Sequence, residues 1–305
     1  MTNYELFRIF VPAMEYTLNC NGRLLSLDTP QVMGILNATP DSFYAASRQQ
    51  TEGQIAARAH QIVEEGGTII DVGACSTRPD SEPASEAEEM ERLRMALSVV
   101  RRELPDAIIS VDTYRPDVAR MAVEEYGADI INDVGGPVNC KLSMVNGPRN
   151  ATLSPREWSM VHGQFDMFRM VSRLGVPYIY MSRQATMREV LLDCAKAVDR
   201  LRSMGQKDII LDPGFGFGKT LEQNYAVMLE LERMQMLHLP LLVGVSRKSM
   251  IHKFLRISQD EALNGTVVLN TIALTKGADI LRVHDVYEAV EAVRIYAKLS
   301  NSKIE

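Results

Sequence analysis

The chain has 305 residues, of which 46% are hydrophobic and 24% are charged, and its net charge is −6. A negative net charge argues against non-specific nucleic-acid binding, so an anionic substrate would need a local cationic pocket. The length suits one large domain better than two of average size. We therefore expect a single domain over residues 1–305.

The composition also bears on the compartment. The four cysteines lie far apart and form no CxxC pair, which argues against a disulfide framework or a zinc site and suits a reducing cytoplasm. They are Cys20, Cys75, Cys140 and Cys194. Residues 1–14 lack the basic start and apolar core of a signal peptide, and no apolar run approaches the roughly 18 residues of a membrane span. The sequence predicts a cytoplasmic protein without membrane contact.

The first predicted element is a β-hairpin over residues 16–27. Asn21-Gly22 lies at its centre, and this dipeptide is a strong two-residue turn signal because both residues tolerate positive φ. The hairpin precedes the first strand of the main sheet. We expect it to form a plug across one end of the domain.

Eight short apolar runs follow, and nearly every one ends in a polar residue. They span 32–37, 69–73, 108–113, 130–133, 176–181, 209–214, 241–247 and 280–285. Helical periodicity separates them over 54–65, 85–103, 118–126, 187–204, 221–236, 261–276 and 286–299. Eight alternations of buried strand and helix predict an α/β protein with a (β/α)8 TIM barrel, whose active site gathers at the carboxyl ends of the strands.

One stretch does not follow this alternation. From residue 135 to about 162 the chain is rich in Gly, Pro, Asn and Ser, and it contains the only tryptophan, Trp158. A loop of this length is unusual in a compact barrel. We interpret it as an extended loop after the fourth strand, either folded over the barrel mouth or a disordered surface insertion.

The strand ends provide a first group of candidate site residues. Asp112, Asn132 and Asp212 end strands 3, 4 and 6, and Lys248 follows strand 7. Carboxylates accept paired N–H bonds from a guanidine-like edge, and an amide both donates and accepts. Four such residues at equivalent positions of separate repeats predict a pocket for a flat heterocycle, although each alone could be a capping or ion-pair residue.

A second group is cationic. Residues 246–249 read Ser-Arg-Lys-Ser after strand 7, and Arg282 and His284 alternate along strand 8, so they share one face. Barrels often bind phosphate near strands 7 and 8. We expect an anion site here, with Asn37 at the end of strand 1 as an oxygen ligand suited to Mg²⁺.

Residues 212–219 read Asp-Pro-Gly-Phe-Gly-Phe-Gly-Lys. Their spacing is neither GxGxxG nor Walker A, which argues against a mononucleotide site. We interpret the glycines as positions where the backbone can approach a ligand bound by Asp212.

Together these motifs resemble the dihydropteroate synthase family, in the same order and over nearly the whole chain. The motifs are 33–43 (MGILNATPDSF), 76–79 (STRP), 110–113 (SVDT), 131–134 (INDV), 211–219 (LDPGFGFGK), 246–251 (SRKSMI) and 282–285 (RVHD). The resemblance implies the joining of 6-hydroxymethyl-7,8-dihydropterin diphosphate to 4-aminobenzoate, with release of diphosphate, in folate biosynthesis. The resemblance also implies that the protein is a homodimer. In this family, sulfonamides mimic the aminobenzoate.

The resemblance further implies a role for each candidate residue. Asp112, Asn132, Asp212 and Lys248 would bind the pterin, with Met181 and Phe217 completing the substrate pocket. Arg282, His284 and Asn37, with Mg²⁺, would take the diphosphate. Thr77, Arg78 and Ser249 would shape the aminobenzoate site. Early C–O cleavage would leave a pterin-stabilised cation, favoured by the two aspartates, and an anionic leaving group, favoured by the cationic cluster.

Three segments depart from the family pattern. The first loop continues as Tyr-Ala-Ala-Ser-Arg over 44–48, where the family usually has Ser-Asp-Gly-Gly. The strand-5 exit reads Met-Ser-Arg-Gln-Ala over 181–185 in place of Met-His-Met and a glycine turn. The segment after 135–136 is longer than the family's. The second departure bears on one wall of the pterin pocket.

Two alternatives remain at this point. A pterin-dependent methyltransferase would share the pterin-binding residues but would not need the cationic cluster. A non-catalytic pterin-binding protein would explain the altered loops. Under the synthase interpretation, segments 37–48 and 75–86 would close over the substrates, so that the pterin diphosphate binds first and aminobenzoate second.

Overall fold

Eight parallel strands form a closed barrel, as the sequence predicts. The computed structural model describes residues 16–38, 48–74, 84–135 and 166–301. The hydrogen-bonded order is β8-β7-β6-β5-β4-β3-β10-β9, and a parallel bridge between Leu211 and Leu241 joins the two outer strands. The strands are β3 (Gln31–Asn37), β4 (Ile69–Gly73), β5 (Ile108–Asp112), β6 (Ile130–Asp133), β7 (Tyr178–Met181), β8 (Ile209–Asp212), β9 (Leu242–Val243) and β10 (Ile280–Val283).

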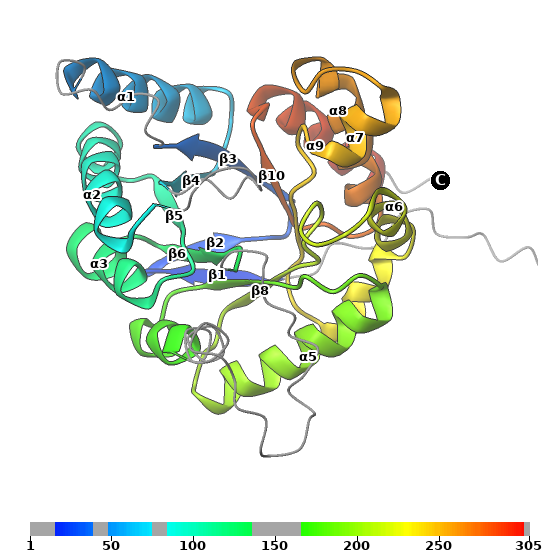
Figure 1. Cartoon of the computed structure of the whole chain (residues 1–305), viewed down its shortest axis with the longest axis horizontal. Helices are drawn as coiled ribbons and strands as arrows, with labels where there is room; N and C mark the ends of the chain where they lie inside the picture. The colour runs from blue at the N-terminus through cyan, green and yellow to red at the C-terminus, as the bar shows by residue number, and fades with distance from the viewer. Residues whose placement is uncertain (1–15, 39–47, 75–83, 136–165, 302–305) are drawn as a thin grey trace, which may run out of the picture.

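Helices surround the strands on the outside (Figure 1). They are α1 (Arg48–Glu64), α2 (Glu86–Glu103), α3 (Pro116–Tyr126), α5 (Met187–Ser203), α6 (Leu221–Leu229), α7 (Ser249–Leu255), α8 (Leu263–Thr275) and α9 (Val286–Asn301), with 3-10 segments η3 (Leu231–Leu237) and η4 (Asp260–Ala262). Residues 166–174 are also helical. Within the described residues, no helix is long and apolar enough to cross a membrane.

The barrel interior is layered. Each strand contributes one inward apolar side chain near its amino end, and these form a single cluster: Met33, Ile69, Ile108, Ile130, Ile179, Ile210, Leu242 and Ile280. Side chains alternate along a strand, so the residue two positions further on also faces inward. On five strands that residue is polar: Asp71, Ser110, Asn132, Asp212 and Arg282. An apolar floor therefore lies beneath a polar layer at the carboxyl ends of the strands.

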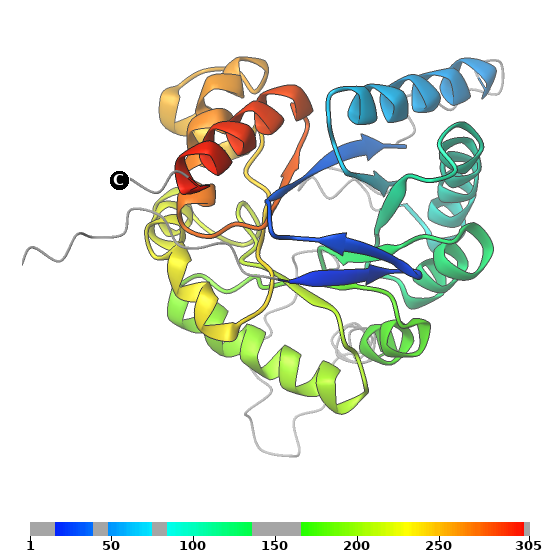
Figure 2. The same cartoon turned by 180° about the vertical axis from the view of Figure 1, so that it is seen from behind.

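The predicted hairpin covers the apolar end of the barrel. Strands β1 (Thr17–Cys20) and β2 (Arg23–Ser26) pair antiparallel, and both turn residues have positive φ, 52° at Asn21 and 88° at Gly22. Leu18, Cys20 and Leu27 belong to the same cluster as the floor of the barrel. Figure 2 shows the hairpin lying across this end. The hairpin thus excludes water from the floor, and ligands must enter from the opposite end.

A buried carboxylate attaches the hairpin to the barrel wall. Asp129 is fully buried and accepts hydrogen bonds from Arg23 (2.7 Å) on β2, Arg101 (2.9 Å) on α2 and the backbone N–H of Ile109 (2.8 Å). Charge-assisted bonds of this kind are about twice as strong as neutral ones. They fix the plug independently of its apolar contacts.

Two helical segments were not expected from the sequence. Residues 166–174, which no predicted element covered, are helical, and α7 lies between β9 and η4. The helix predicted over 221–236 is divided at Glu230 into α6 and the 3-10 segment η3. The predicted loop over 135–162 lies outside the described residues, except for its first position. A capping box joins Ser85 and Glu88 at the start of α2.

Asp279, just before β10, makes the fold sensitive to pH. Burial raises its pKa to about 7, while a hydrogen bond from the backbone N–H of Leu241 (2.8 Å) acts in the opposite direction. Because the folded state retains this proton above the ordinary pKa, the contribution of Asp279 to stability falls as pH rises from about 4 to about 7.

We expect Asp279→Asn to remove this dependence. Its unfolding free energy relative to the wild type should increase by roughly 2 kcal/mol between pH 5 and pH 8, measured by urea denaturation. The exposed Asp199→Asn on α5 is the control and should show no such trend. A difference between Asp279→Asn and wild type that stays constant with pH would contradict the assignment.

Candidate active site at the barrel mouth

The polar layer centres on a buried guanidinium. Arg282 on β10 contacts Asp71 on β4 through Nε (2.6 Å) and Asp112 on β5 through Nη2 (2.7 Å). Burial acts to lower the pKa of Arg282, but the two carboxylates more than offset it, so the pKa is raised. The guanidinium is therefore charged, and it connects strands that are distant in sequence.

Asp71 is the member of this layer with the most partners. It is fully buried, and besides Arg282 it accepts hydrogen bonds from the Ser110 hydroxyl (2.6 Å) and the Asn132 amide (3.1 Å). A buried carboxylate is stable only when paired and hydrogen-bonded. Asp71 meets this condition through three side chains on three other strands.

This arrangement leaves Asn132 with one free acceptor. Its amide nitrogen donates to Asp71, while its Oδ1 is buried and has no hydrogen-bond partner among the described residues. An unsatisfied buried acceptor costs about 1–3 kcal/mol. A ligand N–H placed in the mouth would remove that cost, as the sequence-based assignment of Asn132 to substrate binding requires.

Asp112 lies level with Asn132, its partner in the sheet register, and with Gly73 on its other side. Burial raises the pKa of Asp112 to about 7, although Arg282 acts in the opposite direction and Asp71 adds to the increase. Asp112 is thus already paired with Arg282. A ligand that approaches Asp112 must share it with, or replace, that guanidinium.

Asp212 ends β8, and the glycine-rich segment begins beside it. Its Oδ1 accepts a hydrogen bond from the backbone N–H of Gly214 (2.7 Å). Gly214 has φ of 71°, and a Cβ there would come within 2.1 Å of the Ser182 carbonyl oxygen, so only glycine fits. Burial raises the pKa of Asp212, and the charge of Lys248 opposes this. Met181 is buried against the same turn.

Lys248 contacts the glycine-rich segment that follows Asp212. It precedes α7, whose first residue is Ser249, and donates a hydrogen bond to the Phe215 carbonyl. Its Nζ lies 4.6 Å from the centroid of the Phe217 ring. Burial lowers the pKa of Lys248 to about 8, although Asp212 favours the charged form. Lys248, Asp212 and Phe217 therefore form one wall.

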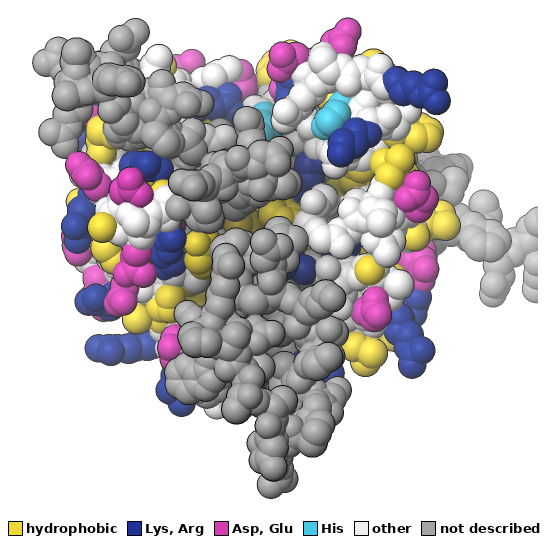
Figure 3. Space-filling model, in the orientation of Figure 1, with side chains coloured by type: hydrophobic (Ala, Val, Ile, Leu, Met, Phe, Trp, Pro, Cys, Tyr) yellow, Lys and Arg dark blue, Asp and Glu magenta, His cyan; other side chains and the backbone are white. Residues whose placement is uncertain are grey.

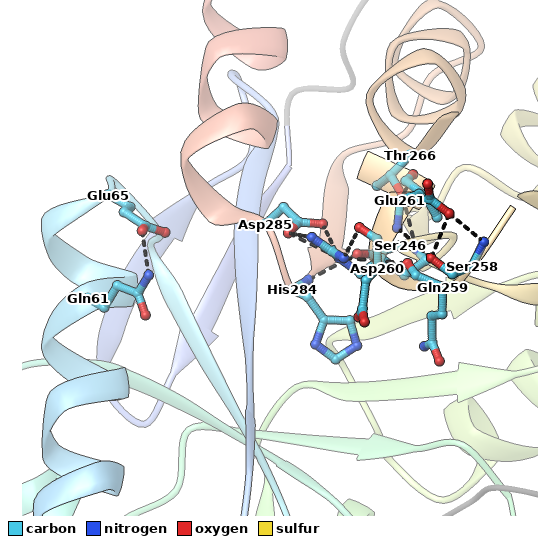
Figure 4. Close-up of polar contacts among 12 residues, drawn as sticks. Gln61, Glu65, Ser246, Ser258, Gln259, Asp260, Glu261, Thr266, His284 and Asp285 are labelled. Atoms are coloured by element: carbon cyan, nitrogen blue, oxygen red, sulfur yellow. Dashed lines mark hydrogen bonds and ion pairs between the residues drawn. The ribbon is translucent and has the colours of Figure 1, made fainter. Parts of the chain in front are cut away.

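His284 lies just beyond β10, on the same face as Arg282. Burial and then Arg282 lower its pKa to about 4. At neutral pH it is an uncharged hydrogen-bonding group, so the cationic character expected at this position comes from Arg282. Figure 4 shows its imidazole pointing away from Asp285, with Ser246 beside its backbone. The Ser246 hydroxyl accepts a bond from the His284 N–H (3.1 Å).

Arg247 does not belong to the expected cationic cluster. Its guanidinium makes a bidentate ion pair with Asp285, at 2.7 and 2.9 Å, and donates to the Asp260 carbonyl (2.8 Å). These contacts hold β9, η4 and the start of α9 together. The grouping of Arg247 with the anion site was wrong, because its charge is used within the fold.

One further candidate, Asn37, lies at the rim of the mouth. Asn37 ends β3 with its side chain exposed, level with Gly73 in the register. Thr77 and Arg78 fall outside the described residues, as do most of segments 37–48 and 75–86. Figure 3 shows Lys and Arg side chains near the centre of the face that carries the barrel mouth.

Two structural contributors were not singled out from the sequence. Asp71 was visible only as a charge within an otherwise apolar run, a pattern typical of a buried ion pair. Arg58 on α1 donates to the His284 carbonyl (2.6 Å) and to the Ile35 carbonyl (3.2 Å), which positions the β10 exit. No sequence signal distinguishes it from other helix-surface arginines.

We expect Asp71→Asn to destabilise the fold by about 3–5 kcal/mol, because Arg282 would lose one of its two buried counterions. Ser110→Ala removes one neutral donor from the same carboxylate and should cost about 1–2 kcal/mol. Urea denaturation of both variants measures the difference. Equal losses would show that Asp71 acts as a hydrogen-bond acceptor and that its charge is immaterial.

Comparison with known proteins places this geometry in a family. A model of pterin-binding enzymes matches residues 33–284. Dihydropteroate synthase of Escherichia coli K12 is 35% identical over 301 residues, covering 94% of this chain and 97% of the relative. The structure of Xanthomonas albilineans dihydropteroate synthase with 4-aminobenzoic acid aligns with a TM-score of 0.79 at 30% identity, covering 94% of this chain and 98% of that one. The Yersinia pestis enzyme with a pterine–sulfa conjugate aligns with a TM-score of 0.75 at 31% identity, covering 94% and 100%.

Proposed function

The chain belongs to the dihydropteroate synthase family of pterin-binding enzymes, and on that premise we propose that it joins 6-hydroxymethyl-7,8-dihydropterin diphosphate to 4-aminobenzoate in folate biosynthesis. The products are 7,8-dihydropteroate and diphosphate. The observation that carries the proposal is the convergence of Asp112, Asn132, Asp212 and Lys248 at one barrel mouth. The names of the relatives favour this transferase activity over methyl transfer and over a non-catalytic role.

The pterin is held by groups that match its hydrogen-bonding edge. The Oδ1 of Asn132 is a buried acceptor in need of a donor, and the Asp212 carboxylate accepts N–H bonds from the guanidine-like part of the ring. Lys248 donates to a ring acceptor from the wall that it forms with Phe217. These groups bind the ring in one orientation, with its hydroxymethyl substituent directed toward the strand 7 and 8 exits.

Charge separation in the reaction follows the charges of the site. Cleavage of the C–O bond leaves positive charge on the pterin methylene, which the Asp112 and Asp212 carboxylates stabilise. Arg282 and neutral His284 donate hydrogen bonds to the departing diphosphate. The amine of 4-aminobenzoate then attacks the methylene and loses a proton. Thr77, Arg78 and Ser249 are proposed to line the aminobenzoate site.

Mg²⁺ fits this site as an ion carried with the diphosphate. Among the described residues, no group of three or more His, Cys, Asp or Glu side chains could hold a metal. Mg²⁺ commonly takes one or two protein oxygens together with substrate phosphates and water. The exposed amide of Asn37 at the β3 exit provides one such oxygen. When bound, the ion would neutralise part of the diphosphate charge.

We propose that the protein acts as a homodimer. Apolar side chains are exposed on three consecutive outer helices: Phe254 and Leu255 on α7, Val268 and Ile272 on α8, and Ile295 and Leu299 on α9. Figure 2 shows α8 and α9 side by side. Isolated exposed apolar residues are ordinary, but several on neighbouring helices favour a protein interface. This surface lies on the outside of the barrel, away from the mouth.

The decisive measurement is diphosphate release on mixing the enzyme, both substrates and Mg²⁺. We expect turnover by the wild type and a loss of about 100- to 1,000-fold in Asp212→Asn, because one preorganised electrostatic contact is worth roughly that much. Asp199→Asn, an exposed carboxylate on α5, should keep full activity. Wild-type pterin affinity of Asp212→Asn in calorimetry would refute its role.

The metal assignment has its own test. Asn37→Ala should raise the Mg²⁺ concentration that gives half-maximal turnover by about tenfold, since one of few protein ligands is removed. The affinity for unphosphorylated 6-hydroxymethylpterin, which carries no diphosphate, should stay unchanged. An unaltered Mg²⁺ requirement would exclude Asn37 as a ligand.

A further inference from the structure

The exit of β7 places an arginine at the junction of three strand ends. Arg183 follows Met181 and Ser182, and its Nη2 donates to the carbonyls of Val134 (2.8 Å) and Gly135 at the β6 exit. Its Cζ lies 5.9 Å from the centroid of the Phe217 ring, in the glycine-rich segment after β8. One side chain thus contacts the ends of β6 and β8 from β7.

Gly135 is shaped to receive this guanidinium. Its φ is 69°, and a Cβ there would come within 3.0 Å of Arg183 Nε and 3.1 Å of Cζ. The plane of the guanidinium therefore packs directly on the bare backbone. Burial lowers the pKa of Arg183, although Asp133 favours its charge, and its Nε has no partner among the described residues. A buried cation with an unpartnered Nε is unfavourable for folding. Its presence therefore suggests a role for the guanidinium in the arrangement of the neighbouring strand ends.

Two cations lie near the ring of Phe217 as a result. Lys248 Nζ is 4.6 Å from the ring centroid, and Arg183 Cζ is the second positive group. A cation near an aromatic face contributes about 0.5–2 kcal/mol, depending on desolvation. Fixing the ring fixes the surface along which the Lys248 side chain extends toward Asp212.

The β7 and β8 exits are also joined without Arg183. Lys219 donates to the carbonyls of Ser182 (3.3 Å) and Gly214 (2.9 Å). The Ser182 hydroxyl donates to Asp193 on α5 (2.7 Å). Loss of Arg183 would therefore spare this local fold. Two contacts are made by Arg183 alone. One is with the β6 exit, just after Asn132, and the other is with the Phe217 ring.

We propose that Arg183 is a positioning residue for the pterin side of the pocket, which sets Phe217, and through it Lys248, relative to Asn132. This inference rests on the proposed function and names the element that shapes its pterin wall. The contacts that support this role are those of Nη2 with the two backbone carbonyls and of the guanidinium with the Phe217 ring.

The test compares Arg183→Met and Arg183→Lys with Arg188→Met, an exposed arginine of the adjacent helix α5. Arg183→Met should raise the KM for the pterin diphosphate about tenfold, a loss of about 1.4 kcal/mol, and leave the KM for 4-aminobenzoate unchanged. Arg183→Lys keeps a charge but lacks the planar group, so its effect should be intermediate. Arg188→Met should match the wild type.

Binding of unphosphorylated 6-hydroxymethylpterin, measured by calorimetry, should weaken in parallel in Arg183→Met. Coupling to the ring is tested with Phe217→Leu: the double variant should lose less than the sum of the two single losses. Unchanged kinetics, an equal rise in both KM values, or full additivity with Phe217→Leu would overturn the role of Arg183. Absence of turnover in the wild type would instead overturn the proposed function, since that measurement compares no variant of Arg183.

Discussion

One buried cation determines how the polar layer of this barrel is arranged. The guanidinium of Arg282 lies between Asp71 and Asp112, and leaving it unpaired would cost several kcal/mol. Asp71 is fully buried beside this cation, and its oxygens also accept hydrogen bonds from Ser110 and Asn132. The Asn132 amide is thereby oriented with its nitrogen toward Asp71, and its oxygen remains as an acceptor for a ligand. The ligand-binding group thus follows from the charge balance of the fold.

The same constraint explains why the two ends of the barrel differ. A charged layer is stable inside a barrel only if water reaches it from one side or every group is paired. Below it, the apolar floor and the hairpin with Leu18 and Cys20 exclude water. Above it, the carboxylates of Asp112 and Asp212 are incompletely compensated, and burial raises the pKa of both. The free energy available for binding is therefore concentrated at the mouth, where ligands with N–H donors and positive charge are favoured.

Local signals in the sequence predicted the barrel and the places where its site residues lie. The strand ends and the Asn21-Gly22 turn each depend on residues close together in the chain. Contacts between residues far apart in the chain could not be predicted from such local patterns. Asp71 meets Arg282 across 211 positions, and Arg247 meets Asp285 across 38, so that its charge is not available to an anion. Helix α7 has only seven residues, too few for its apolar period to be distinguished. Residues 166–174 do have a helical apolar spacing, with Met167, Phe168 and Val171 buried, and this signal was overlooked.

The Arg282–Asp112 pair also sets a requirement on the substrate under the proposed function. Without ligand, the carboxylate that would receive the pterin and the cation that would receive the diphosphate satisfy one another. A ligand that carried only a guanidine-like edge would compete with Arg282 and leave a buried cation undercompensated. A ligand that carried only diphosphate would withdraw Arg282 from Asp112 and leave a carboxylate whose burial already raises its pKa to about 7. A molecule with both groups exchanges one internal pair for two intermolecular ones, so the site favours the pterin diphosphate over either part alone.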